Sequence, residues 1–174
     1  MSGDLDRRDV LKLLTASAFA FPLQITAASP DKPLYFSVEE FALLDTLTEH
    51  IIPRDNHSPG AHDAGVASYI DRMVAEAFLP EEKDAWNKGL VEINRLSIEA
   101  SHRPFIKASK SAQIELLTKL ARGEQNPKSE GEKFFQVLKE TAVFGYYTSA
   151  IGINKDIGYK GNVIQEQFSG YAAT

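Results

Sequence analysis

Apolar residues recur at intervals of three or four in five segments of this chain, the spacing that places them on one face of an α-helix. Two of these segments begin with Ser37 and Ser129, each followed three residues later by a glutamate, and this pair is typical of the capping box at a helix N-terminus. We expect helices over residues 37–52, from about 63 to 78, from 80 to about 102, from about 111 to 122 and from 129 to 147. Because no run alternates apolar and polar residues as a half-buried strand does, the sequence predicts an all-α fold of about five helices.

The apolar positions of each segment also predict which side chains form the core. In the second segment these are Val66, Tyr69, Ile70, Met73, Val74, Ala77 and Phe78, and in the fourth they are Ile114, Leu117 and Leu120. In the third they are Trp86, Leu90, Ile93 and Ser97. The C-terminal half of the fifth segment is apolar nearly all round, as expected of a central helix or of a helix with one face in an interface. After Ala150 the helical spacing ends, and glycines among aromatic residues predict an irregular Gly/Tyr-rich tail.

Length, charge and cysteine content narrow the classes of protein to which this chain can belong. Its 174 residues suit one domain with a short additional segment, and its net charge of −5 argues against non-specific binding to nucleic acid, which needs clustered lysine and arginine. The absence of cysteine excludes disulfides, cysteine-ligated zinc, iron–sulfur clusters and covalently attached c-type haem in this chain.

The first 28 residues have the parts of an export signal: a basic start, a short apolar stretch and small residues before a cleavage site. The basic part contains the signal residues Arg7, Arg8, Leu11 and Lys12. The apolar stretch, Leu13–Ile25, is too short and too polar for a membrane span, which needs about 20 apolar residues. We predict a twin-arginine signal over residues 1–28, a helical domain over residues 29–174 and a periplasmic location. The alternative is an amphipathic N-terminal helix with a chance Arg-Arg pair.

One polar loop has residues that could bind a metal ion. His57 and His62 lie close in sequence to Asp55 and Asp63, and two imidazoles with two carboxylates are a ligand set that zinc accepts. The chain would then be a free-standing periplasmic metal-dependent enzyme. The simpler interpretation is a solvated loop whose aspartates cap its turn and the next helix, because the spacing of the two histidines fixes no metal geometry.

Motifs of catalysis and cofactor binding do not occur in this sequence. It has no phosphate-binding loop, dinucleotide-binding glycine pattern, nucleophile elbow or His-Glu-x-x-His motif. Its paired acidic residues, such as Glu39-Glu40 and Glu81-Glu82, lie in the first turns of expected helices, where the helix dipole favours them. We therefore expect no catalytic, cofactor-binding or metal-binding residues in this chain.

Aromatic residues are concentrated in the fifth helical segment and in the tail. Most of them should form hydrophobic core, but tyrosine also combines a large apolar surface with a polar tip, which suits a protein interface. The candidate contacts to a partner are Phe144, Tyr146, Tyr147, Tyr159 and Tyr171. A helical binding module for an unrelated partner would also fit this pattern.

Several short motifs follow one another along the chain. They are Arg7-Arg8, Ile51-Ile52-Pro53, Pro59-Gly60-Ala61, Ala64-Gly65-Val66, Tyr69-Ile70-Asp71, Phe134-Phe135, Leu138-Lys139, Gly145-Tyr146-Tyr147 and Ile157-Gly158-Tyr159. In this order and spacing they resemble the small subunit, also called subunit 3 or gamma, of membrane-bound gluconate 2-dehydrogenase-type flavoprotein complexes. The resemblance extends from about Phe36 to Tyr171.

The resemblance implies a non-catalytic role in an oxidoreductase complex. In such complexes a large FAD-containing subunit oxidises a sugar, sugar acid or polyol. A multihaem cytochrome c subunit, whose presence here the resemblance leaves open, passes the electrons to the membrane quinone pool. The small subunit carries the signal for the twin-arginine translocase and helps to fold and export the large subunit. The implied cofactors, FAD and haem c, therefore belong to the partners.

Overall fold

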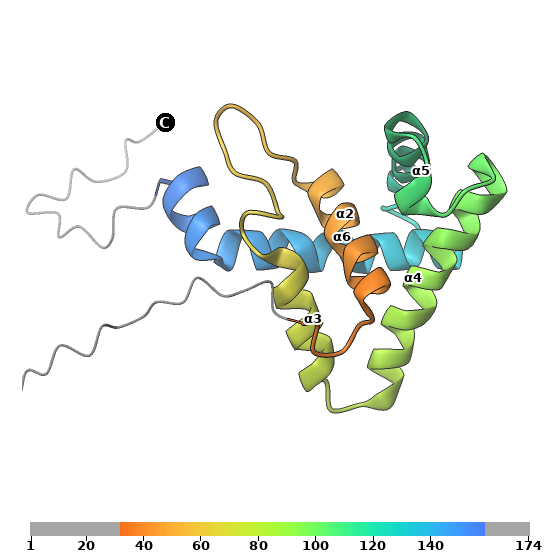
Figure 1. Cartoon of the computed structure of the whole chain (residues 1–174), viewed down its shortest axis with the longest axis horizontal. Coiled ribbons are helices and arrows are strands. Elements are labelled where there is room, and N and C mark those ends of the chain that lie inside the picture. The colour runs from red at the N-terminus through yellow and green to blue at the C-terminus, as the bar shows by residue number, and fades with distance from the viewer. Residues whose placement is uncertain (1–31, 159–174) are drawn as a thin grey trace, which may run out of the picture. The chain divides into compact units, whose positions relative to one another are not determined.

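The computed structural model describes residues 32–158, which form α-helices, short helical turns and loops (Figure 1). The α-helices are α2 (Val38–Ile51), α3 (Val66–Glu76), α4 (Pro80–Ser101), α5 (Lys110–Arg122) and α6 (Glu130–Thr148). The turns are the 3₁₀ turn η1 (Phe105–Lys107) and the π-helical turn η2 (Gly152–Asp156). Five α-helices, with no strand among the described residues, confirm the all-α prediction. The predicted signal and most of the predicted tail lie outside these residues.

Both predicted capping boxes are present. At the start of α2, the Ser37 hydroxyl accepts the backbone N–H of Glu40 at 3.2 Å, and the Glu40 carboxylate accepts the N–H of Ser37 at 2.9 Å. Ser129 and Glu132 make the same reciprocal pair at the start of α6, at 3.3 and 3.0 Å. Each box satisfies two of the N–H groups that a helix start leaves without a partner, so both helices begin where the sequence indicates.

Helix α6 lies at the centre of the helical unit and contacts α2, α3, α4 and α5 (Figure 1). One side of α6 is buried through Phe134, Phe135, Leu138, Ala142, Gly145 and Tyr146. The core that these residues join includes Leu44 and Leu47 of α2, Ile70 and Val74 of α3, Leu90 and Ile93 of α4, and Leu117 and Leu120 of α5. The opposite side of α6 keeps apolar residues at the surface. The fifth helix is therefore the central helix, and it also presents an apolar surface.

Helices α4 and α6 approach each other closely where Gly89 meets Phe134. A methyl group placed on Gly89 would overlap the Phe134 ring, so the missing side chain lets the ring lie against the backbone of α4. The same ring meets Trp86 edge to face, with the two ring centroids 5.5 Å apart. Trp86, Leu90, Ile93 and Ser97 are all buried, as the spacing in this segment predicts.

A buried carboxylate on α3 holds the chain segment that leads into α2. Asp71 is almost fully buried, and its Oδ2 accepts the backbone N–H of Leu34 at 2.6 Å. Its Oδ1 accepts the N–H groups of Tyr35 and Phe36, each at 3.0 Å. Hydrogen bonds to an ionised acceptor are stronger than neutral ones, so this one side chain fixes three consecutive backbone groups. No local pattern in the sequence predicts this contact, because its partners are 35 to 37 positions apart.

Several details of the helix predictions are wrong, and among them Tyr69, expected in the core of the second segment, is exposed. The second helix begins after Gly65 and not near Asp63, because Gly65 adopts a left-handed conformation (φ 67°) that a helix does not continue. Phe78 lies beyond the end of α3 and is exposed, although its spacing placed it in the core. In α5, Leu116 is buried and Ile114, the expected core residue, is exposed.

Candidate functional site

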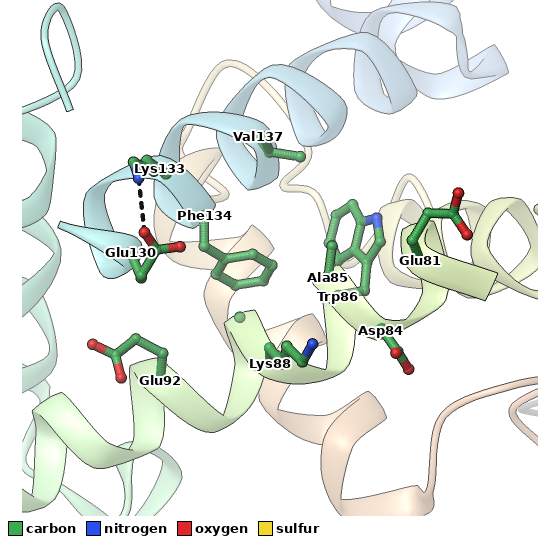
Figure 2. Close-up of a pocket in the computed structure, with 11 residues that line it drawn as sticks. Glu81, Asp84, Ala85, Trp86, Lys88, Glu92, Glu130, Lys133, Phe134 and Val137 are labelled. Carbon is green, nitrogen blue, oxygen red and sulfur yellow. Dashed lines mark hydrogen bonds and ion pairs between the residues drawn. The ribbon is translucent and has the colours of Figure 1, made fainter. Parts of the chain in front are cut away.

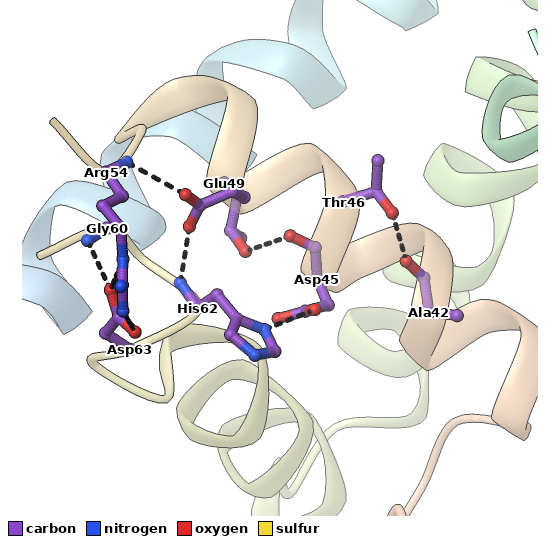
Figure 3. A network of polar contacts seen from close by, with 9 residues as sticks. Ala42, Asp45, Thr46, Glu49, Arg54, Gly60, His62 and Asp63 are labelled. Carbon is purple, nitrogen blue, oxygen red and sulfur yellow. Dashed lines mark hydrogen bonds and ion pairs between the residues drawn. The ribbon is translucent and has the colours of Figure 1, made fainter. Parts of the chain in front are cut away.

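The loop between α2 and α3 is fixed by a network of polar contacts (Figure 3). The Glu49 carboxylate, near the end of α2, accepts the backbone N–H of Arg54 at 2.9 Å and that of His62 at 2.8 Å. The Asp63 carboxylate accepts the N–H of Gly60 at 3.0 Å and also pairs with the Arg54 guanidinium. Two carboxylates therefore satisfy backbone groups from both ends of the loop and hold it in one shape.

The four loop residues considered as metal ligands contact different partners. The Asp55 carboxylate accepts the N–H groups of His57 and of the residue after it, at 2.7 Å each, and these bonds lower the pKa of Asp55. Asp63 belongs to the network in Figure 3, and His62 Nδ1 lies 2.8 Å from Asp45 Oδ2. Within residues 32–158, no three His, Asp or Glu side chains gather in a group that could hold a metal ion. The loop residues are thus engaged in capping and pairing.

The pairing of His62 with Asp45 predicts a measurable change in histidine titration. The Asp45 carboxylate accepts a hydrogen bond from the imidazolium and attracts its charge, which raises the pKa of His62 above its ordinary 6.5. Protonated His62 therefore stabilises the fold below about pH 6.5. This contribution, small because the ring is largely exposed, is lost as the pH rises through the raised pKa. NMR titration should give His62 a midpoint above 6.5 that moves back toward 6.5 in Asp45→Asn, and an identical midpoint in both proteins would contradict the pairing.

Apolar side chains remain exposed on the side of α6 that faces away from the core. We call Val137, Val143, Phe144 and Tyr147 the α6 outer face. Phe144 is 60% exposed and Tyr147 is 44% exposed, and the Phe144 ring centroid lies 6.3 Å from that of Tyr69 on α3. Exposed aromatic residues that lie together are typical of protein interfaces. Two of the residues expected to contact a partner are therefore at the surface.

A groove between α4 and α6 adjoins the α6 outer face (Figure 2). The hollow of this α4–α6 groove has a volume of about 530 Å³. Its apolar lining consists of Ala85, Trp86, Gly89, Phe134 and Val137. Its charged lining consists of Glu81, Asp84, Lys88, Glu92, Glu130 and Lys133. Val137 belongs to both the groove and the outer face, so the two apolar surfaces are continuous.

A second hollow, of about 730 Å³, lies among α3, α4 and α6 and shares Ala85, Trp86 and Val137 with the α4–α6 groove. Its lining also includes Tyr69, so the apolar surface extends from the groove onto α3. The helical spacing predicts Trp86 as a core residue, and neither hollow was predicted. One feature of the sequence could have indicated them. Ala85 and Gly89 are small residues four positions apart, so they lie on one face of α4 and leave space beside it.

Comparison with known protein families gives a match over most of the chain. The family model described as gluconate 2-dehydrogenase subunit 3 matches residues 38–163, which include all five α-helices described above. This chain belongs to the gluconate 2-dehydrogenase subunit 3 family. Membership is consistent with the small subunit of a dehydrogenase complex and implies association with the other subunits of that complex. No curated protein and no solved structure matched the chain.

In this subunit 3 chain, Tyr146 is a core residue, which corrects its assignment as a partner contact. Its side chain is 1% exposed, and its hydroxyl donates to the Pro59 carbonyl at 2.6 Å. Burial raises the pKa of this hydroxyl. Because the ring is enclosed and its hydroxyl is bonded, Tyr146 joins the loop to α6 and offers no surface to another protein. Tyr159 and Tyr171 lie outside the described residues, so their roles stay predictions.

The export signal predicted for this subunit 3 chain also lies outside the described residues. Its residues Arg7, Arg8, Leu11 and Lys12 precede the region that the family model matches. In the part of the chain that the structure describes, no helix is both long enough and apolar enough to cross a membrane.

Proposed function

We propose that this chain is the non-catalytic small subunit of a periplasmic, FAD-dependent sugar, sugar-acid or polyol dehydrogenase complex. It binds the large flavoprotein subunit, stabilises it and escorts it through the twin-arginine translocase. The observation that carries the proposal is the α6 outer face, an exposed apolar surface on the helix whose other side forms the centre of the core.

The position of this surface on α6 suits a binding role. Helix α6 is held on its buried side by residues such as Leu138 and Ala142, so Phe144 and Tyr147 project from a rigid element. Little conformational freedom would be lost when these rings bind a partner. A stable interface buries about 1,200–2,000 Å² or more, and aromatic residues near its centre contribute most to affinity. The outer face and the adjoining α4–α6 groove would supply such a centre.

The redox chemistry in this proposal belongs to the partners. FAD is bound by the large subunit, and haem c is bound by a cytochrome subunit where the complex contains one. A chain without cysteine has no residue to which haem c could be attached. The small subunit contributes a contact surface and an export signal, and the large subunit determines which substrate is oxidised.

Co-expression of this chain with the large subunit tests the escort role. With the wild-type chain, the large subunit should be recovered from the periplasm with FAD bound. The double variant Arg7→Lys, Arg8→Lys should retain most of both proteins in the cytoplasm, because the translocase reads the arginine pair as an address. Cell fractionation and the flavin content of the large subunit in each fraction measure this outcome.

A matched control is Arg122→Lys, an exposed arginine in the last turn of α5, which should leave export unchanged. If the large subunit reaches the periplasm with bound FAD when this chain is absent, the escort role is wrong. If the large subunit needs this chain but the double lysine variant exports it normally, the twin-arginine signal is wrong and the binding role stands.

A further inference from the structure

The α4–α6 groove combines an apolar lining with an excess of negative charge. Four of its charged lining residues are acidic and two are basic. Lys133 lies 2.7 Å from Glu130, so one of the two lysines already has an acidic partner within the groove. Glu92 pairs with Arg95 at 2.7 Å. The other two acidic residues of the lining, Glu81 and Asp84, lie at the end of the groove nearest the start of α4, and we call this the acidic end (Figure 2).

The nearby Lys83 is directed away from this acidic end. Its ammonium group donates to the Ala75 carbonyl of α3 at 2.9 Å and lies 5.7 Å from the centre of the Tyr35 ring. Lys83 therefore caps the end of α3 and does not offset the charge of Glu81 and Asp84. Lys88 is the remaining lysine in the lining of the groove.

We propose that the α4–α6 groove receives an apolar segment of the large subunit that is flanked by lysine or arginine. The apolar lining would bury the apolar side chains of that segment, and Glu81 and Asp84 would attract its flanking cations. Continuity with the α6 outer face through Val137 makes the groove part of one larger contact surface. This inference rests on the proposed function, because it names the part of the partner that the groove binds.

The first test fills the groove without changing charge. In Ala85→Gln, a longer polar side chain would occupy the groove at an exposed position of α4 that lies outside the outer face. We expect the affinity of the full chain for the purified large subunit, measured by biolayer interferometry, to fall about tenfold, because the amide must lose water when the segment binds. The matched control is Ala100→Gln, an exposed alanine on the same helix that lines neither hollow, which should change affinity less than about twofold.

The second test changes charge. Glu81→Lys reverses one acidic group of the groove, and Glu39→Lys makes the same change at the equivalent first-turn position of α2. We expect Glu81→Lys to weaken binding about three- to tenfold at low salt, with a smaller effect at 0.5 M NaCl, because salt screens exposed charges. Glu39→Lys should leave binding within about twofold of wild type at both salt concentrations.

The outcomes separate this inference from the proposed function. If Ala85→Gln binds as wild type does, the groove proposal is overturned, while the proposed function stands as long as the large subunit still needs this chain for export. If Glu81→Lys binds more tightly, the partner segment is acidic and the proposal is wrong. If the wild-type chain and the large subunit do not bind each other at all, the proposed function fails together with the groove.

Trp86 is the chain's single tryptophan and lines the groove. Its fluorescence emission can therefore show whether something other than the large subunit occupies the groove. In the isolated chain, its emission should not depend on protein concentration and should not change when residues 159–174 are removed. A change with concentration would identify a second copy of this chain as the occupant, and a change on truncation would identify the chain's own C-terminal residues. Either change would overturn the proposal, whereas a shift of this emission when a large subunit labelled with a tryptophan quencher is added supports it.

Discussion

Replacing Asp71 with alanine is expected to lower the free energy of unfolding by about 3–4 kcal/mol. The change removes the acceptor of three backbone N–H groups, from Leu34, Tyr35 and Phe36. A hydrogen bond to a charged group contributes about 1.5–3 kcal/mol, and a buried donor left without a partner costs about 1–3 kcal/mol. The expected loss is smaller than the sum of these terms, because the first two N–H groups are only partly buried and can bond to water.

Urea unfolding of the wild-type chain and two further variants completes this test. Asp71→Asn keeps one acceptor oxygen and should lose less stability than Asp71→Ala, because an amide can still accept part of the hydrogen bonds. The control Glu76→Ala removes an exposed carboxylate from the same helix and should change stability by less than about 0.5 kcal/mol. Faster hydrogen exchange at the Phe36 amide should accompany the loss in Asp71→Ala. A loss below about 1 kcal/mol would show that this carboxylate does not hold the segment before α2.

Replacing Gly89 with alanine is expected to lower the free energy of unfolding by about 2–3 kcal/mol. Alanine favours a helix over glycine by about 1 kcal/mol, so the expected loss runs against helix propensity. It arises because the new methyl group would overlap the Phe134 ring, which is also packed against Trp86 and has little room to move. Helices α4 and α6 would have to separate for the methyl group to fit.

Two comparisons isolate this steric effect in urea unfolding. Gly131→Ala adds a methyl group whose nearest neighbour is the flexible end of the Leu96 side chain, so we expect a change of less than about 1 kcal/mol. In a Phe134→Leu background the ring is absent, and Gly89→Ala should cost less than it does in the wild-type chain. Equal costs in the two backgrounds would mean that Phe134 does not set the distance between these helices.

Helix starts were predictable because they depend on residues that are neighbours in sequence. Ser37 with Glu40 and Ser129 with Glu132 satisfy the N–H groups of their own first turns, and no distant contact is needed. The same holds for Pro80 at the first position of α4. Where a distant or conformational effect intervened, as with the left-handed Gly65 before α3, the predicted start was early.

The candidate interface could be predicted only in part. Phe144 and Tyr146 are two positions apart on α6, so they point to different sides of the helix, one exposed and one buried. Both sides of this part of α6 are apolar, and an amphipathic pattern indicates the buried face only when the other face is polar. Spacing therefore could not separate the core residue from the surface residue.

The sequence by itself determined the all-α fold, the order of the five helices and, through the order of its short motifs, the family that the family model confirms. The tertiary structure alone decided which side of α6 is buried, which backbone groups Asp71 holds and where the α4–α6 groove lies. The physical reason is the range of the interactions. Helix periodicity and caps arise within a few residues, whereas these contacts join segments that are tens of residues apart and meet only when the helices pack.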